Sequence, residues 1–509
     1  MTVMKKSSVW VALLGVAIGA LAVLCAQKIS PRGKMKVSGG DWSKLSLVLR
    51  SLEENYVDTI DYSKVSEAAI AAALQSLDPH SYYMEPRSLE EHEEELAANF
   101  DGIGIQFNVP NDTAVVIEVI PGGPSEKVGL QSGDKLLKVD DTPIAGVKFP
   151  QDSMVRRIKG KAGSKVRLSI QRGKEIIPFE ITRGKIPTHS VDAAFMVSDS
   201  VAYLRLSKFS RTTAKEMLEN GIKLKGEGMK EMILDLRDNT GGFMDQALSL
   251  SNLFLEKGDT IVYMEGLHRK KEEYLADGRG PFKDIRLKVL IDENTASSSE
   301  IVAGALQDNH RATIIGRRSF GKGLVQEPFY FTDGSGMRIT VARFYTPSGR
   351  CIQKPYSEDY NYEVYKRYSE GEMVVADSMK VENGGILPDV FVAMDTTKAG
   401  KFYMDCSRKA TTMRFASDFF ERHRDRIASI ASFGELDAYL NSAPLEKEFL
   451  AFALNRDSLK PSEAEWKKDG IYLMTQVKAL VGRYSLLSES AYYHIYLAID
   501  TTFNKALEL

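Results

Sequence analysis

The sequence predicts a multidomain α/β protein, and three features of the 509-residue chain lead to this prediction. Residues 186–395 alternate short apolar runs with amphipathic stretches, as strands and helices alternate in α/β folds. Residues 96–185 carry short β-prone runs separated by turn residues, which indicates a compact β-rich unit. Residues 27–95 and 396–509 show helical periodicity. With residues 1–26 as a separate targeting segment, this organisation fits the three or four domains that such a length allows.

The composition is that of an ordinary globular protein, with 43% hydrophobic and 27% charged residues and a formal net charge of −2. This balance gives no support for binding to nucleic acid, which requires a concentration of positive charge. The three cysteines, Cys25, Cys351 and Cys406, are too few for a disulfide framework, and pairing of Cys351 with Cys406 is an alternative of low weight.

Residues 1–26 form a targeting segment. Lys5 and Lys6 precede a run from Val9 to Ala26 that contains no charged residue. The run is close to the shortest length that spans a bilayer and is long for the apolar part of a signal peptide. We therefore favour an uncleaved signal anchor, with cleavage after Ala26 as the alternative. The lysines on the N-terminal side predict that the bulk of the chain lies on the outer side of the membrane.

Residues 41–95 are expected to be helical, up to a turn. Apolar residues recur at helical spacing over Leu45–Leu52, and an alanine-rich helix is expected over Ser66–Leu77. The sequence LDPHS at Leu77–Ser81 then forms a turn. The simplest interpretation of this region is a packing arm.

The β-rich unit and the α/β region each have a predicted set of strands. In residues 96–185 the strands are Ile103–Val109, Ala114–Val119, Lys135–Val139, Val166–Ile170 and Ile176–Ile181, with short helices near Pro124–Val128 and Gln151–Ile158. In residues 186–395 they are Val201–Leu206, Glu231–Leu236, Ile261–Met264, Leu287–Ile291 and Ala312–Ile315.

The stretch Asn294–Gln326 carries the clearest chemical pattern. It follows a strand with a tight turn and a helix, which places Ser297 at the helix entrance, where free N–H groups and a positive dipole suit a nucleophile. The spacing Ser297-x-x-Glu300 also matches a capping box, and on spacing alone that structural role is the commoner one. Lys322 lies further along between two glycines, and Gln326 follows it.

A lysine can serve as the base that a serine nucleophile needs. None of the seven histidines lies in a convincing triad motif, and His80 belongs to a turn. Free lysine titrates near 10.4, so Lys322 must be buried to lose its proton readily. Neighbouring apolar residues such as Phe320 and Leu324 favour such burial. A glutamine partner can accept a hydrogen bond from the amine without adding a charge.

The segment TASSSE, its spacing to FGKG, and Gln326 resemble the C-terminal processing (tail-specific) peptidases, serine proteases with a Ser–Lys dyad and a PDZ domain. The resemblance implies Ser297 as nucleophile, Lys322 as general base and Gln326 as the residue that holds the lysine. Ser298 replaces an alanine common in the family, and the distance to Lys322 favours Ser297 over it. The motif LDLRDNTGG implies Gly241 or Gly242 as an oxyanion-hole donor, with the Ser298 N–H as the second.

The β-rich unit resembles PDZ domains of the bacterial type through PGGPS at 121–125 and GLQSGD at 129–134. Gly102, Ile103, Gly104 and Ile105 are then similar to the loop whose amides bind a peptide's terminal carboxylate. An exposed strand edge beside such a glycine loop suits a free C-terminus. The resemblance to the family covers about residues 41–395, and it implies a ClpP/crotonase-like protease core over 186–395.

Residues 396–509 extend beyond the predicted core. Apolar residues around Phe415–Phe420, Phe449–Leu454 and Met474–Val481 predict amphipathic helices. A small bundle packed on the core is the simplest interpretation, and a dimerisation or substrate-guiding module is the alternative, so homo-oligomer formation stays open.

Taken with the resemblance, the sequence predicts a serine endopeptidase of the bacterial cell envelope. It would be anchored in the inner membrane, with its catalytic domain on the periplasmic side, and would act on proteins with free C-termini. No cofactor, no metal and no nucleic acid are expected. A catalytically silent PDZ scaffold is the main rival hypothesis, and a crotonase-like acyl-CoA enzyme is a weaker one.

Overall fold

The structure is a computed structural model, and it describes residues 43–86, 99–187, 189–356, 362–375, 384–395 and 400–509. The chain divides into two compact units, Met1–Ile70 and Ala71–Leu509. Within the described residues, no helix has both the length and the apolar character needed to cross a membrane. The predicted targeting segment Val9–Ala26 lies outside the described residues.

The first unit contains helix α2 (Ser43–Asn55) and the beginning of helix α3 (Tyr62–Gln75). Both helices confirm the helical periodicity of this region, and α3 begins earlier and ends earlier than predicted. A short strand, β1 (Tyr82–Met84), follows α3 in the second unit. Sequence reasoning missed this strand, because it is stabilised by pairing with a distant strand rather than by local periodicity.

The β-rich unit contains an antiparallel sheet with strand order β3-β4-β5-β7-β8. The short strand β6 (Thr142–Pro143) also pairs with β5. The strands are β3 (Ile105–Asn108), β4 (Ala114–Val119), β5 (Lys135–Val139), β7 (Lys165–Arg172) and β8 (Glu175–Thr182). Helices α5 (Pro124–Val128) and α6 (Gln151–Ile158) have the predicted bounds. Buried residues such as Val116, Leu136, Met154 and Ile170 form the core of the unit.

The predicted strand Ile103–Val109 is wrong in one respect, because the extended conformation is interrupted at Gly104. This glycine has φ +78°, a conformation that other residues rarely adopt, so the strand cannot run through it. On its N-terminal side, β2 (Asn99–Gly102) leaves the sheet and pairs with β9 (Gly184–Pro187). The break therefore creates a loop between β2 and β3 at the position that the sequence suggested for carboxylate binding.

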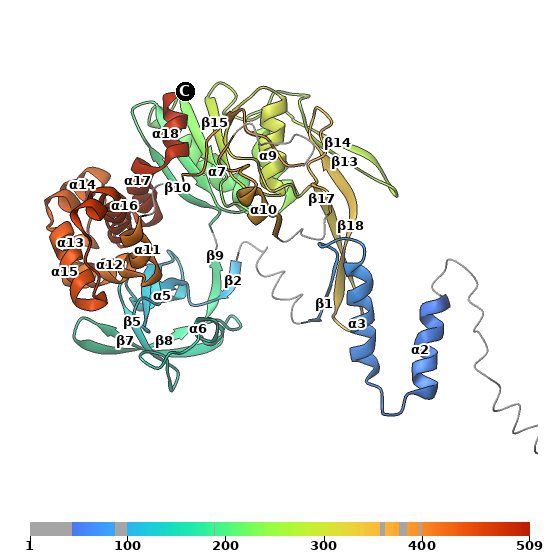
Figure 1. Ribbon diagram of the computed structural model, residues 1–509, viewed down its shortest axis with the longest axis horizontal. Coiled ribbons are helices and arrows are strands. Elements are labelled where there is room, and N and C mark those ends of the chain that lie inside the picture. Colours follow the sequence, from blue (N-terminus) through green and yellow to red (C-terminus); the bar gives the residue numbers. More distant parts are fainter. Residues whose placement is uncertain (1–42, 87–98, 188, 357–361, 376–383, 396–399) are drawn as a thin grey trace, which may run out of the picture. The chain divides into compact units, whose positions relative to one another are not determined.

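The α/β region is built on a six-stranded sheet with order β10-β11-β12-β15-β16-β19, of which Figure 1 labels β10 and β15. The strands are β10 (Val191–Met196), β11 (Val201–Leu206), β12 (Glu231–Asp235), β15 (Arg286–Ile291), β16 (Thr313–Gly316) and β19 (Val390–Phe391). All neighbours are parallel except β10 and β11. The four predicted strands of this sheet are confirmed, because buried parallel strands are continuous apolar runs.

Helices α7 (Thr213–Gly226), α8 (Met244–Asn252) and α9 (Ser298–Asp308) contribute to the main hydrophobic core beside this sheet. A second cluster joins Tyr203, Ile233 and Leu290 of the sheet to Phe503 and Ala506 of the C-terminal helix α18 (Thr501–Glu508). The parallel sheet is thus packed with helices from two parts of the chain.

A separate antiparallel sheet has the order β1-β18-β13-β14, with β17 also paired to β18. Its longer strands are β13 (Thr260–Gly266), β14 (Arg269–Leu275), β17 (Leu324–Tyr330) and β18 (Gly336–Tyr345). The predicted strand Ile261–Met264 exists but belongs to this sheet rather than to the parallel one. Helix α10 (Glu363–Ser369) follows β18 along the chain.

The C-terminal region is helical, as predicted. Its helices are α11 (Lys401–Arg408), α12 (Thr411–Arg422), α13 (Arg424–Ile427), α14 (Phe433–Ser442), α15 (Leu445–Asp457), α16 (Glu463–Gly482), α17 (Ser488–Tyr496), η4 (Leu497–Ile499) and α18. Phe415, Phe419, Phe449 and Val477 lie in a core of their own. Cys406 is buried there, and Cys406 and Cys351 are both free thiols, so the alternative disulfide is not formed.

Candidate functional site

The candidate nucleophile lies at a strained strand–turn–helix junction. Strand β15 ends at Ile291, a turn follows, and Ser297 is the N-cap of α9. Its backbone has φ 57° and ψ −116°, a conformation that residues with a Cβ atom rarely adopt. Such a conformation costs about 1–3 kcal/mol and persists only where surrounding contacts impose it. Those contacts come from Glu300, as described below.

Three consecutive serines compete for the role of nucleophile, and their surroundings differ. The Ser298 hydroxyl is buried and donates to the carbonyl oxygen of Gly242 at 2.9 Å. The Ser299 hydroxyl is buried and donates to the carbonyl oxygen of Asn239 at 3.0 Å. Ser297 is only partly buried. The hydroxyls of Ser298 and Ser299 therefore bind the N-terminus of α9 to the loop that follows β12. This favours Ser297 as the reactive serine.

The capping interpretation of Ser297 and Glu300 is correct in part. The two residues have the reciprocal arrangement of a capping box, and the Glu300 carboxylate accepts a hydrogen bond from the Ser297 N–H at 2.8 Å. The Ser297 side chain, however, makes no cap hydrogen bond of standard geometry. The Glu300 N–H donates instead to the Ser297 carbonyl oxygen at 2.8 Å. The structural role and a chemical role of Ser297 are therefore compatible.

The same glutamate holds the loop that carries Lys322. Glu300 is fully buried, and its carboxylate accepts hydrogen bonds from the Gly321 N–H at 2.7 Å and from the Lys322 N–H at 2.8 Å. It also accepts one from the Ser319 hydroxyl at 2.5 Å. Burial raises the pKa of Glu300, whereas these hydrogen bonds lower it. A single carboxylate thus joins the backbone of both residues of the predicted dyad.

The environment of Lys322 favours loss of its proton. Burial lowers the pKa of Lys322, and the positive charge of Arg338 on β18 lowers it further. Glu300 and Asp78 act in the opposite direction without reversing the shift. Among the described residues, no hydrogen bond joins the Lys322 amine to the Ser297 hydroxyl. The structure therefore brings the two residues to one carboxylate without showing direct contact between their side chains.

Gln326 does not hydrogen-bond Lys322 in this structure, although the resemblance implied that contact. Its side-chain amide donates instead to the backbone carbonyl oxygen of His80 at 2.5 Å. Burial lowers the pKa of the His80 imidazole to about 4, and the charge of Lys322 contributes to this shift. His80 is therefore neutral at ordinary pH and lies within electrostatic reach of the lysine. Gln326 thus ties β17 to the turn that precedes β1.

The glycines of the LDLRDNTGG loop lie close to Ser297 and its neighbours. Gly241 has φ 98°, and a Cβ at this position would lie 2.8 Å from the Ser297 Cβ and 2.9 Å from the Ser298 nitrogen. Gly242 has φ 146°, and a Cβ there would lie 2.1 Å from the Phe209 carbonyl oxygen. Neither position tolerates a side chain.

The two glycine N–H groups differ in their availability. The Gly241 N–H donates to the side-chain oxygen of Asn239 at 2.9 Å and is therefore occupied. The Gly242 N–H has no hydrogen-bond partner in the described part of the chain, and the Ser298 N–H has none either. The spacing of the sequence did not decide between the glycines, and these bonds favour Gly242 as an oxyanion donor.

The candidate peptide-binding site lies on the β-rich unit. Strand β3 is at the end of its sheet and pairs with β4 only, so its other edge has no described strand beside it. The loop of Gly102, Ile103, Gly104 and Ile105 precedes this edge. The Ile103 and Gly104 carbonyl oxygens accept from the Ser125 and Ile120 N–H groups at 2.9 and 3.0 Å, which fixes the loop.

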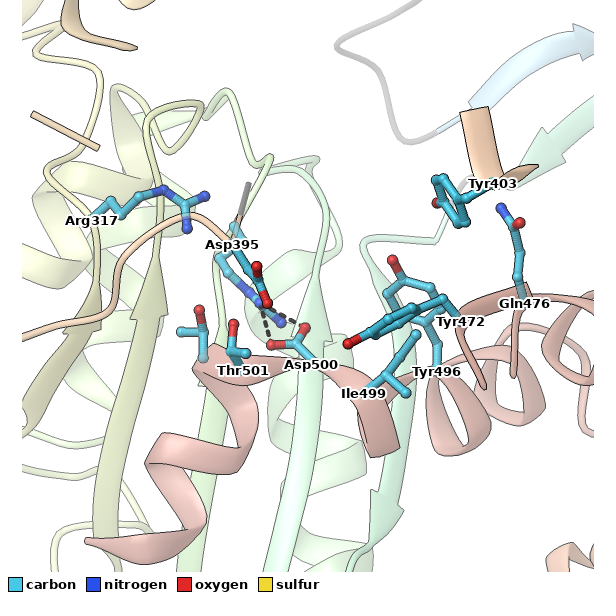
Figure 2. Close-up of a pocket in the computed structure, with 11 residues that line it drawn as sticks. Arg317, Asp395, Tyr403, Tyr472, Gln476, Tyr496, Ile499, Asp500 and Thr501 are labelled. Atoms are coloured by element: carbon cyan, nitrogen blue, oxygen red, sulfur yellow. Dashed lines mark hydrogen bonds and ion pairs between the residues drawn. The ribbon is translucent and has the colours of Figure 1, made fainter. Parts of the chain in front are cut away.

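A cavity of about 310 Å³ lies away from the candidate catalytic residues, between the parallel sheet and the C-terminal helices. Figure 2 shows the tyrosines Tyr472 and Tyr496 beside Ile499, and dashed lines that reach Asp500. Asp500 forms an ion pair with Arg237 at 2.8 Å, and Arg237 also pairs with the buried Asp235 at 2.6 Å. Arg237 belongs to the LDLRDNTGG motif, so this motif contributes one residue to the lining of the cavity.

Sequence reasoning missed three contributors to the site. Glu300 was predicted only as a capping residue, because its other partners lie more than 18 positions away in the chain. His80 was dismissed because it lies in a turn, and Arg338 carried no local motif. The proximity of Glu300 to Ser297 in the sequence was the one available signal.

Comparisons with known proteins identify the families that match the α/β region and the β-rich unit. Residues 200–362 match Peptidase family S41, and residues 102–182 match the PDZ domain family. Residues 402–486 match a family of unknown function.

Individual relatives match about two thirds of the chain. The carboxy-terminal processing protease CtpA of Bacillus subtilis (strain 168) is 34% identical over 348 residues, which is 68% of this chain and 74% of the relative. A probable CtpA-like serine protease of Staphylococcus aureus (strain N315) is 34% identical over 64% of this chain, which spans 65% of that relative. A solved structure, the photosystem II D1 C-terminal processing protease, is 26% identical with a TM-score of 0.40 and covers 70% of this chain and 87% of its own. The chain therefore belongs to the carboxy-terminal processing proteases of Peptidase family S41, serine-type peptidases with a PDZ domain.

Proposed function

We propose that this protein is an endopeptidase of the cell envelope that cleaves with Ser297 and Lys322. The neutral Lys322 amine takes the proton from the Ser297 hydroxyl while the serine oxygen attacks the substrate carbonyl carbon. The C–N bond then breaks, Lys322 returns the proton to the leaving amine, and an acyl-enzyme ester remains. Water hydrolyses this ester with the same lysine as base.

In this mechanism the N–H groups of Gly242 and Ser298 stabilise the oxyanion of the tetrahedral intermediate. Both are without a partner among the described residues, whereas the Gly241 N–H is occupied. Preorganised N–H donors of this kind are worth about 3–4 kcal/mol of transition-state stabilisation. We propose that Gln326 orients Lys322 during catalysis, when its amide oxygen accepts from the lysine amine a hydrogen bond that the structure does not show, while the amide nitrogen keeps donating to His80.

The observation that carries the proposal is the shared attachment of Ser297 and Lys322 to Glu300. Both backbone N–H groups donate to the same carboxylate at 2.8 Å, so the nucleophile turn and the lysine loop are held as one unit. Burial of Lys322, which lowers its pKa, supports its role as base. A catalytically silent scaffold would have no need for a strained serine and a buried lysine fixed to one acceptor.

The substrate is proposed to be a protein with a free C-terminus. The unpaired edge of β3 suits addition of an extended peptide strand, and the loop at Gly102–Ile105 lies where the peptide would end. Backbone N–H groups in such a loop form an anion-binding concavity for the terminal carboxylate. The PDZ unit would thus select the substrate that the Ser–Lys site cleaves.

The proposed location is the outer face of the bacterial inner membrane. The motivation is the uncharged run Val9–Ala26 preceded by Lys5 and Lys6. Protease treatment of intact spheroplasts tests this orientation, and protection of the catalytic domain would refute it. Assembly into a homo-oligomer through the C-terminal helices is a further proposal, tested by the solution mass of the purified protein.

The experiment that tests the proposed function is incubation of the purified protein with envelope proteins, followed by sequencing of the new termini. We expect new C-termini in the wild-type reaction and none with Ser297→Ala. A serine-reactive probe should label the wild type on Ser297. Absence of both cleavage and labelling in folded protein would instead support the silent scaffold.

A further inference from the structure

The loop that carries Lys322 is packed against a buried cluster of charged side chains. The cluster comes from the loop itself, from the segment after β18, and from helix α10 with the turn that follows it. Its members are Arg318, Lys354, Glu363, Arg367 and Glu372. Arg318 and Arg367 are only 1% and 3% exposed, so the cluster is part of the interior rather than of a solvated surface.

Arg367 on α10 connects this cluster to the loop backbone. Its guanidinium donates to the carbonyl oxygen of Arg318 at 2.6 Å and to that of Ser319 at 3.1 Å. Its third donor, Nε, binds the Glu372 carboxylate at 2.9 Å. Glu372 also pairs with the Arg318 side chain at 2.7 Å. Arg367 is therefore fixed on one side by a carboxylate and on the other by two consecutive carbonyl groups.

The contacts of Ser319 carry this attachment towards the catalytic residues. While its carbonyl accepts from Arg367, its hydroxyl donates to Glu300 at 2.5 Å and accepts from the Ile386 N–H at 2.6 Å. The Glu300 carboxylate in turn binds the Lys322 N–H. A continuous path of hydrogen bonds thus runs from α10 through Ser319 and Glu300 to the base.

An arginine is needed for this arrangement because its donors form a rigid planar fork. Two adjacent carbonyl oxygens and one carboxylate oxygen can be satisfied together by that fork. A lysine in the same place would be a single point charge on a flexible stem, and it could not reproduce all three directions. The identity of the side chain at position 367 therefore matters beyond its charge.

We propose that Arg367 is a positioning residue for the catalytic base, and that α10 fixes the loop from which Lys322 acts. This inference rests on the proposed function and deepens it. Arg367 does not touch the reacting atoms; it acts through Ser319 and Glu300. If the loop loosens, Lys322 becomes better solvated and its proton is harder to remove.

The test compares Arg367→Met and Arg367→Lys with Lys366→Met. Methionine has a similar length but no donors, and lysine keeps the charge without the fork. Lys366 is the neighbouring exposed residue of α10, and its one ion pair with a described residue is that with Glu370, so its variant controls for a changed helix. The measurements are kcat, KM and the pH dependence of kcat on one peptide substrate, with circular dichroism to establish folding.

We expect Arg367→Met to lower kcat about 10- to 100-fold, because small misplacements of a catalytic group have effects of this size. KM should stay within about twofold, and the pH midpoint of kcat should move towards the ordinary lysine value. The kcat and pH midpoint of Arg367→Lys should lie between those of the wild type and Arg367→Met. The kcat, KM and pH midpoint of Lys366→Met should match those of the wild type. The titratable and charged groups that face Lys322, namely Asp78, His80, Glu300 and Arg338, are unchanged in all three variants.

Two results would overturn the inference. One is a folded Arg367→Met or Arg367→Lys variant with wild-type kcat and pH midpoint. The other is a loss of kcat that follows the folded fraction while the midpoint stays fixed, because this would make Arg367 merely structural. If Arg367→Met does not fold, Arg367→Lys decides by the same criteria. Failure of the proposed function is distinct, because the wild type itself would then show no turnover that depends on Ser297.

Discussion

Ser297 and Lys322 donate their backbone N–H groups to the same atom, Glu300 Oε2, at 2.8 Å each. The two residues are 25 positions apart in the chain and belong to a helix N-terminus and to a glycine-flanked loop. Their shared acceptor is fully buried, so neither segment can shift without breaking a bond that water cannot replace. The relative position of the proposed nucleophile and the proposed base is therefore set by backbone contacts, without a side-chain contact between them.

Glu300→Gln should damage catalysis more than folding. The glutamine oxygen can accept hydrogen bonds, but its NH₂ group would face backbone N–H groups that now donate to Glu300. We expect kcat to fall about 100-fold, on the scale of a misplaced catalytic group, and the free energy of unfolding to drop by about 1–3 kcal/mol. Steady-state kinetics and chemical denaturation measure the two effects. The control is Glu327→Gln, at an exposed ion pair; equal activities of the two variants would refute the role of Glu300.

Lys322→Arg should be as inactive as Lys322→Met, although it keeps the positive charge. A guanidinium cannot give up its proton in a protein, so it cannot act as base. In the wild type, the rate should rise with pH through a midpoint below the ordinary lysine value, because burial lowers the pKa of Lys322. A pH profile of kcat measures the midpoint. Turnover by the arginine variant would show that Lys322 is not the base.

Lys322→Met should also be more stable than the wild type at neutral pH. The folded-state pKa of Lys322 is lowered, so folding disfavours its charged form. This cost is fully present below the folded pKa, and it disappears as the pH rises towards the unfolded value of about 10.4. We therefore expect a higher Tm for the variant at pH 7 and a difference that shrinks towards pH 10. Equal Tm values across this range would mean that burial of the lysine carries no such cost.

Arg338→Met should shift the pH profile of the reaction to higher pH. The charge of Arg338 lowers the pKa of Lys322, and its buried Nε has no hydrogen-bond partner in the described part of the chain. Because this nitrogen has no partner, replacing Arg338 with methionine removes the charge and leaves no former partner of Nε unpaired. Activity should fall near neutral pH and recover as the pH rises. Arg343→Met, at an exposed position of the same strand, is the control; a midpoint that stays at the wild-type pH in Arg338→Met would exclude this influence.

The PDZ unit should discriminate a free C-terminus from an amidated one. The full-length Ser297→Ala protein allows binding to be measured without cleavage. Amidation removes the negative charge and one acceptor oxygen, so we expect affinity to fall by about 1–3 kcal/mol, or roughly 5- to 150-fold. Gly104→Val should have a similar effect on the acid peptide, because Gly104 has φ +78° and a Cβ there lies 3.2 Å from the Ile186 Cδ1. Identical titrations for acid and amide peptides would remove C-terminal recognition from the proposed function.

Much of the fold could be predicted because its elements have local causes. Val201–Leu206 and Leu287–Ile291 are buried on both faces of a parallel sheet and therefore form unbroken apolar runs. Strand β17 was not predicted, because Pro328 within it argues against a strand and its stability comes from pairing with β18. The break at Gly104 was missed for a similar reason, since a φ value is not visible in an apolar pattern.

The site was predictable to the extent that its residues are close in sequence or carry a family motif. Ser297, Lys322 and the glycine pair were predicted in this way, and their catalytic roles stay predictions. The convergence of Ser319, Gly321 and Lys322 on Glu300 depends on contacts that span about 20 residues and had no local pattern. The choice between the neighbouring serines also required the structure, because it rests on where each hydroxyl donates.

The proposed mechanism depends on Ser297, and not a neighbouring serine, being the nucleophile. The direct test is peptide hydrolysis by Ser297→Ala, Ser298→Ala and Ser299→Ala, each shown to be folded. We predict that Ser297→Ala abolishes turnover, because the attacking oxygen is lost while a cap residue contributes only about 1 kcal/mol. Ser298→Ala should stay active, because its proposed contribution is a backbone N–H, and Ser299→Ala should lose mainly stability. Full activity of Ser297→Ala, with loss of activity in Ser298→Ala or Ser299→Ala, would show that a neighbouring serine is the nucleophile.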